Sequence, residues 1–155
     1  MPHIISRNHQ NAWRSLLIAQ SWAIRQIEFQ LRKANEISFD VYEVLQTLED
    51  SEGGKLRMSD LADRILFSRS GLTRMIDRLE ELGYVVREPS PDDRRGWYAV
   101  VTPKGKEVRH RACDIVQTTL QAIWEKSLSD EEAVALVPVM ESVTKLARDY
   151  EPIRG

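Results

Sequence analysis

The segment MSDLADRILFSRSGLTRMIDRLEELGYVVREPSPDDRRGWYAVVTPKG, residues 58–105, decides the fold of this chain. Its first part predicts a short helix, because Ser59 can cap the free amides of a first turn and Asp60 suits the positive end of a helix. The apolar residues of this helix share one face: Leu61, Ala62 and Ile65. Helical patterning then lapses over residues 66–68, which predict a turn.

A second helix follows this turn, with Ser68 or Ser70 as its cap. Its apolar residues recur at intervals of three and four: Leu72, Met75, Ile76, Leu79 and Leu82. Gly83 is expected to end the helix, since glycine accepts the left-handed conformation that closes a helix. The opposite side carries a polar set: Ser70, Gly71, Thr73, Arg74, Asp77 and Arg78.

This polar set has the chemistry of a helix that reads DNA. Small residues allow close approach, serine and threonine hydroxyls reach bases or phosphates, and an arginine can grip a guanine at two points. The alternative is an ordinary amphipathic helix whose polar side only meets solvent. The segment that follows favours DNA.

That segment predicts a β-hairpin, with strands over residues 84–87 and 97–101 that are rich in aromatic and β-branched residues. The adjacent Arg94 and Arg95 lie near its tip and could enter a narrow minor groove, where the negative potential of DNA is strongest. We expect Asp93 to orient Arg95 through a two-pronged ion pair, with Arg94 on phosphate or exchanging roles with Arg95. A solubilising loop is the alternative. The order helix, turn, helix, hairpin is typical of a winged helix-turn-helix that grips duplex DNA.

Amphipathic helices flank this segment, and their patterns cover residues 10–33, 38–50, 103–126 and 129–150. Thr102 and Pro103 mark the start of the third helix, while Ser129 and Glu132 form a capping box for the fourth. Long helices at both chain ends cannot bury their apolar stripes against a compact central lobe alone. We therefore expect a two-fold homodimer with two recognition helices about one DNA turn apart. A monomer with these helices folded back is the alternative.

The predicted fold is mainly helical with a small β-hairpin wing. Residues 1–36 form an N-terminal dimerisation helix, residues 37–102 the DNA-binding lobe, and residues 103–155 the C-terminal dimerisation helices. Charge follows this division: residues 64–111 hold 11 basic against 7 acidic side chains, residues 1–63 hold 7 against 9, and residues 112–155 hold 4 against 8. The net charge of −2 for the whole chain argues against a nonspecific nucleic-acid coat, but the positive charge gathers where DNA contact is predicted.

The runs LADRILFSRSGLTRMIDRLEELGYVVR and DDRRGWYAVVTPKG resemble the MarR family of bacterial transcriptional regulators, and the flanking helices extend the resemblance over nearly the whole chain. Carried over by position, the resemblance implies DNA contact by five residues of the recognition helix and its preceding turn and by two of the wing: Ser68, Ser70, Gly71, Thr73, Arg74, Arg94 and Arg95. Val101 departs from the leucine that the family more often has there, a change expected to affect packing rather than function.

The resemblance also implies an effector site between the dimerisation helices and the DNA-binding lobe. Trp13, Leu17, Phe39 and Tyr42 could line such a crevice and bind a small aromatic acid or another amphipathic molecule, with Arg14 or His9 available to an anionic group. The alternative is that these aromatic residues only pack in the core. A ligand that prefers a spacing of the recognition helices mismatched to the operator would release DNA.

Enzyme chemistry finds little support in the sequence. No serine, cysteine or carboxylate has a spacing typical of nucleophilic catalysis, and His110 with Cys113 supplies too few ligands for a metal, so we expect neither metal nor cofactor. A single cysteine excludes an internal disulfide, and no long apolar run marks a signal peptide or membrane span, which favours the cytoplasm. The sequence thus predicts a sequence-specific repressor of transcription. The alternative from another class is a winged-helix module that binds an acidic protein partner.

Overall fold

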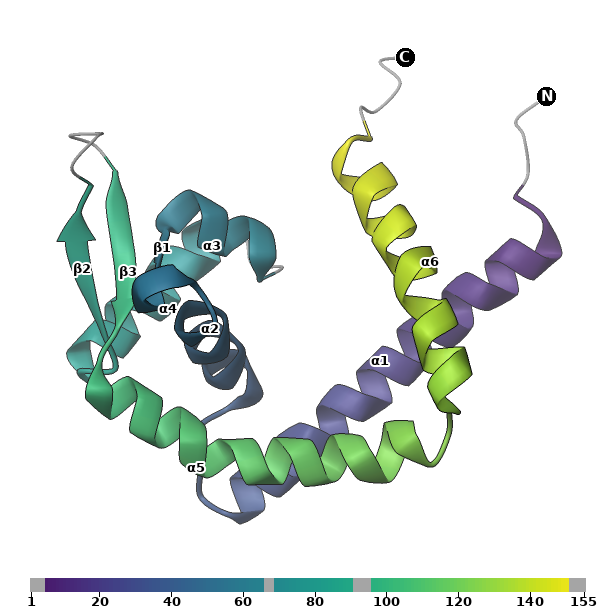
Figure 1. Ribbon diagram of the computed structural model, residues 1–155, viewed down its shortest axis with the longest axis horizontal. Coiled ribbons are helices and arrows are strands. Elements are labelled where there is room, and N and C mark those ends of the chain that lie inside the picture. The colour runs from purple at the N-terminus through teal and green to yellow at the C-terminus, as the bar shows by residue number, and fades with distance from the viewer. Residues whose placement is uncertain (1–4, 66–68, 91–95, 151–155) are drawn as a thin grey trace. The chain divides into compact units, whose positions relative to one another are not determined.

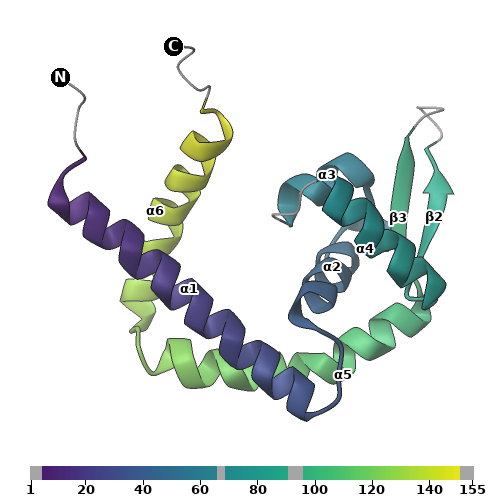
Figure 2. The same ribbon diagram turned by 180° about the vertical axis from the view of Figure 1, so that it is seen from behind.

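The computed structural model describes residues 5–65, 69–90 and 96–150 of the chain, apart from the side chain of Arg69. The chain divides into two compact units, residues 1–119 and residues 120–155. Figures 1 and 2 show the elements from opposite sides: α1 (Arg7–Lys33), α2 (Phe39–Glu49), the 3-10 turn η1 (Glu52–Gly54), β1 (Lys55–Arg57), α3 (Met58–Arg64), α4 (Arg69–Glu81), β2 (Val85–Pro89), β3 (Trp97–Val101), α5 (Pro103–Leu120), the π-helical turn η2 (Gln121–Glu125) and α6 (Asp130–Arg148).

The sheet of the first unit has three antiparallel strands in the order β1-β3-β2. Leu56 pairs with Ala99, and Val85 pairs with Val101, so the buried residues of all three strands point to one face. Helices α2, α3 and α4 complete the core around this face, and their most deeply buried side chains are Val44, Leu45, Leu48, Leu61, Leu72, Ile76 and Leu79. The prediction of a mainly helical fold with a hairpin wing is confirmed.

The end of α4 is closed as its sequence predicts. Gly83 has a φ of 73°, its amide donates to the carbonyl of Glu80, and the amide of Tyr84 donates to the carbonyl of Leu79. This pair of hydrogen bonds satisfies carbonyl groups that the helix end would otherwise leave unpaired. Because Tyr84 takes part in this closure, the first strand of the hairpin begins at Val85 rather than at Tyr84.

The start of α3 differs from the prediction. Its N-cap is the backbone of Arg57 without a side-chain bond, and Ser59 lies inside the first turn, where its hydroxyl donates to Asp60 Oδ1 at 3.0 Å. The reason is β1, which the sequence did not reveal: a strand of three residues leads straight into the helix. Such a strand is too short to show an alternating pattern.

The other helix starts agree with the sequence to within a few residues. Thr102 Oγ1 accepts from the amide of Gly105 at the start of α5, and Ser129 and Glu132 form the predicted capping box of α6. Helix α1 starts at Arg7, three residues earlier than expected, because Ser6 caps it. Helix α5 keeps α-helical winding to Leu120 and continues as the wider turn η2 to Glu125. Within the described residues, no helix combines the length and apolar character needed to cross a membrane.

Candidate DNA-binding surface

Helix α4 carries the described part of the predicted recognition surface. Three of its apolar side chains, Leu72, Ile76 and Leu79, lie in the core with at most 1% exposure, so the opposite side of the helix meets solvent. The predicted DNA-contacting residues of α4 lie away from the core, where Gly71 is half-buried and the rest are exposed: Ser70, Gly71, Thr73, Arg74 and Arg78. The structure therefore brings these five residues together on one accessible helix face.

Arg74 and Arg78 supply the positive charge of this face. Both side chains are exposed, and neither forms an ion pair within the part of the chain that the structure describes. An unpaired guanidinium group on an accessible helix can bind a phosphate or the edge of a guanine without first breaking an internal contact.

The remaining predicted contacts belong to the turn before α4 and to the tip of the hairpin. Ser68, Asp93, Arg94 and Arg95 lie outside the described residues, so their contacts stay predictions. The strands below the tip are well paired: Pro89 lies opposite Trp97, and the amide of Ser90 donates to the carbonyl of Gly96 at 2.9 Å. The hairpin that is to present residues 91–95 is thus anchored in the three-stranded sheet.

Arg87 of β2 joins the hairpin to α4, the predicted recognition helix. Its Nη2 lies 2.6 Å from Asp77 Oδ1 and its Nη1 lies 2.6 Å from Glu80 Oε2, while its backbone amide donates to Glu80 Oε1 at 3.2 Å. Burial alone would lower the pKa of Arg87, but the two carboxylates outweigh it and raise that pKa. No role for Arg87 was predicted from the sequence. The sequence did contain a hint: Asp77 and Glu80 are three residues apart on α4, so their carboxylates are neighbours on the helix surface and can share one cation.

A second basic cluster on the sheet was also missed. Lys55 and Arg57 of β1 both lie over the ring of Tyr98, at 5.4 and 5.6 Å from its centre, and Arg57 Nε donates to the hydroxyl of Tyr98 at 3.3 Å. Lys55 also lies 3.8 Å from Glu88 Oε2. These residues alternate with buried Leu56, so they occupy the outer face of the sheet beside the wing.

The C-terminal end of α4 is tied to the start of α5. Thr102 Oγ1 donates to the carbonyl of Gly83 at 2.7 Å, and Lys104 Nζ donates to the carbonyl of Leu82 at 2.8 Å. A Cβ atom on Gly105 would come within 2.1 Å of the carbonyl oxygen of Tyr84. The absence of a side chain at Gly105 therefore allows α5 to start directly against the recognition helix.

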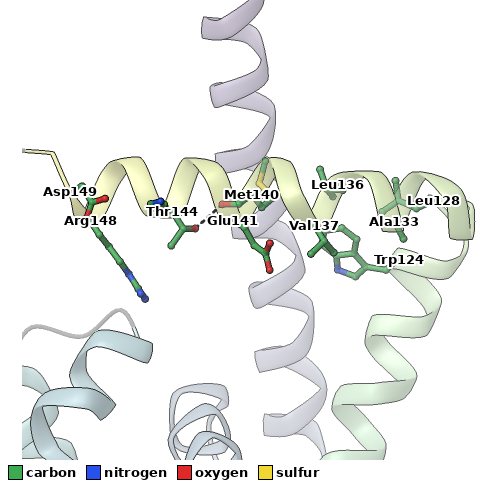
Figure 3. Close-up of a pocket in the computed structure, with 11 residues that line it drawn as sticks. Trp124, Leu128, Ala133, Leu136, Val137, Met140, Glu141, Thr144, Arg148 and Asp149 are labelled. Atoms are coloured by element: carbon green, nitrogen blue, oxygen red, sulfur yellow. Dashed lines mark hydrogen bonds between the residues drawn. The ribbon is translucent and has the colours of Figure 1, made fainter.

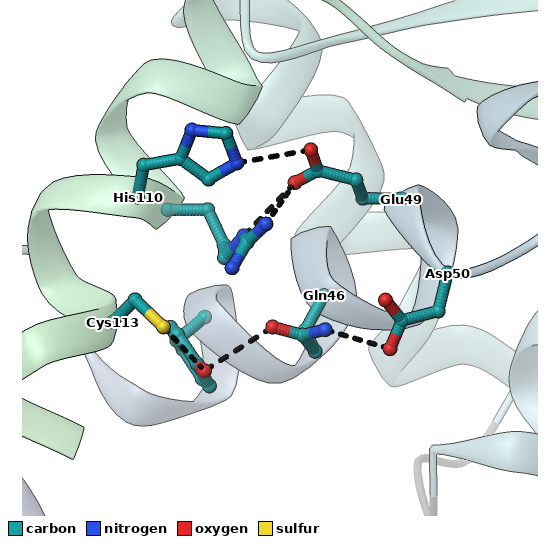
Figure 4. A network of polar contacts seen from close by, with 7 residues as sticks. Gln46, Glu49, Asp50, His110 and Cys113 are labelled. Atoms are coloured by element: carbon teal, nitrogen blue, oxygen red, sulfur yellow. Dashed lines mark hydrogen bonds and ion pairs between the residues drawn. The ribbon is translucent and has the colours of Figure 1, made fainter. Parts of the chain in front are cut away.

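A polar network joins α2 to α5 (Figure 4). Glu49 accepts hydrogen bonds from Arg109 Nε at 2.9 Å and Nη2 at 2.6 Å, and its other oxygen lies 3.0 Å from His110 Nε2. Burial alone would raise the pKa of Glu49, but Arg109 and His110 outweigh it and hold the pKa below its ordinary value. The network locks the end of α2 onto α5.

The four predicted effector-binding residues fall into two groups. Phe39 and Tyr42 of α2 stack with their ring centres 6.1 Å apart, and Tyr42 is buried. Its hydroxyl lies 3.2 Å from Gln46 Oε1 and 3.8 Å from the Sγ of the half-buried free Cys113; burial and Cys113 raise the pKa of Tyr42 to about 12. Trp13 and Leu17 lie at the surface of α1, 55% and 41% exposed. The effector crevice stays a prediction.

The second unit has an open apolar groove along α6 (Figure 3). Its volume is about 810 Å³, and it is lined by Trp124, Leu128, Ala133, Leu136, Val137, Met140, Glu141, Thr144, Lys145, Arg148 and Asp149. Val134, Val143 and Leu146 of the same helix are also exposed. No residue of α6 is buried, so the helix presents apolar surface that a folded protein ordinarily covers.

Metal chemistry has no site in the described part of the chain, where no three His, Cys, Asp or Glu side chains gather to hold an ion. The order helix, turn, helix and anchored hairpin places the chain in the class of winged helix-turn-helix proteins.

Comparison with known proteins narrows the class. The profile of the MarR family matches residues 36–96. Among curated relatives, the regulator SarZ of Staphylococcus epidermidis is 30% identical over 110 residues, which cover 70% of this chain and 71% of SarZ. The regulator PrsX of Escherichia coli is 34% identical over 96 residues, 62% of this chain. The transcriptional repressor MprA of Escherichia coli is 29% identical over 103 residues, 66% of this chain. The matches span only 58% of PrsX and of MprA.

Solved structures agree over almost the whole chain. AbsC, a MarR family transcriptional regulator from Streptomyces coelicolor, has a TM-score of 0.83 at 29% identity and covers 96% of this chain and 99% of its own. A second regulator of the family from that organism, crystallised with DNA, has a TM-score of 0.82 at 28% identity, with 99% and 95% covered. NadR in complex with 4-hydroxyphenylacetate has a TM-score of 0.74 at 26% identity, with 94% and 97% covered. This chain belongs to the MarR family of transcriptional regulators, a family of DNA-binding proteins rather than enzymes.

Proposed function

We propose that this chain binds a pseudo-palindromic DNA operator as a homodimer and represses transcription from it. The observation that carries the proposal is the accessible face of α4, where Arg74 and Arg78 are free of internal ion pairs within the described residues. The likeness to a family member crystallised with DNA supports the same reading, and the name of MprA supports repression. Arg95 is expected to add a minor-groove contact from the wing.

The homodimer is supported by apolar surface on two helices. In α1 the exposed large side chains include Trp13, Ile18, Trp22 and Phe29, each more than half exposed. Helix α6 exposes Val134, Val137 and Leu146 and forms one side of the open groove. Apolar patches of this kind mark surfaces that bind another protein. A second copy of the chain would cover them and set the distance between two recognition helices.

We further propose a small aromatic acid as effector, with Trp13, Leu17, Phe39 and Tyr42 in its site. The likeness to NadR, solved with 4-hydroxyphenylacetate, supports this chemistry. The site would be completed by dimerisation, since Trp13 and Leu17 are exposed in the single chain. A ligand bound there would lower DNA affinity by preferring one spacing of the recognition helices.

The DNA proposal is tested by selecting bound sequences from random duplex DNA and measuring their affinity by fluorescence anisotropy. Arg95→Ala is expected to weaken binding to the selected operator by about 1–3 kcal/mol. Light scattering after size-exclusion chromatography is expected to give the mass of a dimer, and a reporter gene behind the operator is expected to be silenced. A protein with no preference for any duplex, which captures an acidic protein instead, would be a winged-helix interaction module.

The effector proposal is tested with 4-hydroxyphenylacetate and related aromatic acids added to the protein–operator complex. Release of DNA by such an acid, weakened in Trp13→Ala, supports the site. Unchanged operator affinity across the series counts against an aromatic-acid effector while leaving DNA binding intact.

A further inference from the structure

Arg87 is a tightly held cation beside α4, the predicted recognition helix. Its side chain is only 22% exposed, although it lies next to a surface that is otherwise open. Both of its terminal nitrogens are used, one by Asp77 and one by Glu80, each at 2.6 Å. Its backbone amide also donates to Glu80, so strand β2 and helix α4 are joined by a side chain and by main chain.

The two carboxylates that Arg87 holds lie close to the predicted DNA contacts. Asp77 follows Arg74 by three residues and directly precedes Arg78 on α4. Residues three apart on a helix are neighbours, so an unrestrained Asp77 could pair with Arg74. A free carboxylate at this place would also repel a phosphate backbone.

In the structure, Arg87 rather than Arg74 is the partner of Asp77. The planar guanidinium group binds two carboxylates in fixed directions, which a lysine cannot reproduce. The contact therefore does two things: it draws the negative charge of α4 toward β2, and it fixes the helix against the base of the wing.

We propose that Arg87 is a positioning residue for DNA binding, which withdraws Asp77 and Glu80 from the DNA-facing side and so keeps Arg74 available for the operator. The inference rests on the proposed DNA-binding function. It assigns Arg87 no contact with DNA, and this separates it from the arginines of α4 and of the wing.

The test measures operator affinity over a series of salt concentrations with the full chain. Arg87→Met keeps much of the length of the side chain but removes its charge, and we expect at least tenfold weaker binding. Arg87→Lys keeps one charge without the two-pronged geometry, and we expect at least threefold weaker binding. The triple variant Arg87→Met, Asp77→Asn, Glu80→Gln is expected to recover at least threefold of the loss, because Asp77 and Glu80 can then no longer capture Arg74.

Two controls separate positioning from stability and from net charge. Arg109→Met removes an equally short ion pair, 2.6 Å to Glu49, that lies between α2 and α5, and it is expected to change operator affinity less than twofold. The variant Arg87→Met, Glu88→Gln, Glu107→Gln has the net charge of the triple variant but retains Asp77 and Glu80, the two carboxylates that Arg87 binds. It is expected to recover less than twofold. Circular dichroism and size-exclusion chromatography establish that each variant is folded.

Three results would overturn the proposal. One is an affinity within twofold of wild type for Arg87→Met, or for Arg87→Lys if the methionine variant is unfolded. Another is a triple variant that recovers no more than its charge-matched control. The third concerns the slope of log Kobs against log salt concentration. If this slope is shallower by about 0.9 in the triple variant than in wild type, a phosphate contact has been lost, and Arg87 itself binds DNA. If the wild-type chain selects no operator at all, the proposed function fails instead.

Discussion

Gly105 is a residue whose importance lies in the atom that it lacks. Its backbone lies so close to Tyr84 that an added Cβ atom would come within 2.1 Å of a main-chain oxygen, which cannot rotate away as a side chain could. The contact brings α5 against the end of α4, beside the hydrogen bonds from Thr102 and Lys104. One glycine thus sets how α5 meets the end of α4.

Gly105→Ala is expected to destabilise the protein by about 1–3 kcal/mol, the usual cost of forcing an extra carbon into a packed site. Urea denaturation followed by circular dichroism measures the change. Lys106→Ala, at a half-buried neighbouring position, serves as the control and is expected to stay within about 0.5 kcal/mol of wild type. Equal stability of the two variants would mean that the joint relaxes without cost.

Glu49 makes the free energy of unfolding of the first unit depend on pH. Its pKa lies below the ordinary value of 4.5 in the folded chain, because Arg109 and His110 favour the carboxylate. The folded state therefore binds a proton at Glu49 less readily than the unfolded state does. The stabilisation is present above pH 4.5 and is lost as the pH falls through the folded pKa.

Glu49→Gln is expected to lower the free energy of unfolding by about 1–3 kcal/mol at pH 7, since hydrogen bonds to a charged group are lost. As the pH falls from 7 toward 3, wild type should lose its advantage over this variant. Thermal unfolding at a series of pH values gives the comparison. A stability difference that stays constant down to pH 3 would contradict the role given to Glu49.

Helix α4 has a buried side that packs in the core and an exposed side that carries arginines. Its apolar side holds it in the core, and its accessible side presents Arg74 and Arg78. The end of the helix is closed by Gly83 and bonded to α5 through Thr102. Because both its side and its end are held, its arginines are presented from a rigid support rather than from a loop.

Arg74→Ala is expected to weaken operator binding by about 1–3 kcal/mol if the guanidinium reads a base. Competition with operators altered at one base pair shows which base depends on it. Arg78→Ala is the companion variant: a phosphate contact there would lower affinity for all sequences alike and reduce the salt dependence by about 0.9. Unaltered affinity in both variants would remove α4 from the recognition surface.

At the scale of the whole molecule, the exposed apolar surface of α6 is the feature that bears on oligomeric state. The second unit buries none of this helix, and its groove of about 810 Å³ is lined largely by apolar side chains. Helix α1 of the first unit also exposes large apolar side chains that are not covered within the single chain. Surfaces of this composition are stable in water when a partner covers them.

Val137→Asp is expected to convert the proposed dimer to a monomer, because a carboxylate would be buried in an apolar contact. Light scattering gives the mass, and anisotropy with a full operator should show a large loss, since only one recognition helix remains per molecule. Lys126→Ala, exposed and outside the groove lining, is the matched control. A dimer that survives Val137→Asp would place the interface elsewhere.

The helices, the hairpin and their order follow from the sequence alone. Apolar spacing, Gly83, the Thr102–Pro103 start and the capping box of Ser129 with Glu132 are local signals that act within a few residues. They made the winged fold and the polar face of α4 predictable. The contacts expected of Ser68, Asp93, Arg94 and Arg95 remain predictions, as does the effector site.

Only the tertiary structure decided what joins these elements. The strand β1 exists because it pairs with β3, more than 40 residues away, and three residues carry no pattern of their own. The partners of Arg87 come from another element, and the contact of Gly105 with Tyr84 depends on how two chain segments meet in space. Side-chain periodicity reports which face of an element is buried, whereas pairing between distant residues depends on the packed three-dimensional arrangement.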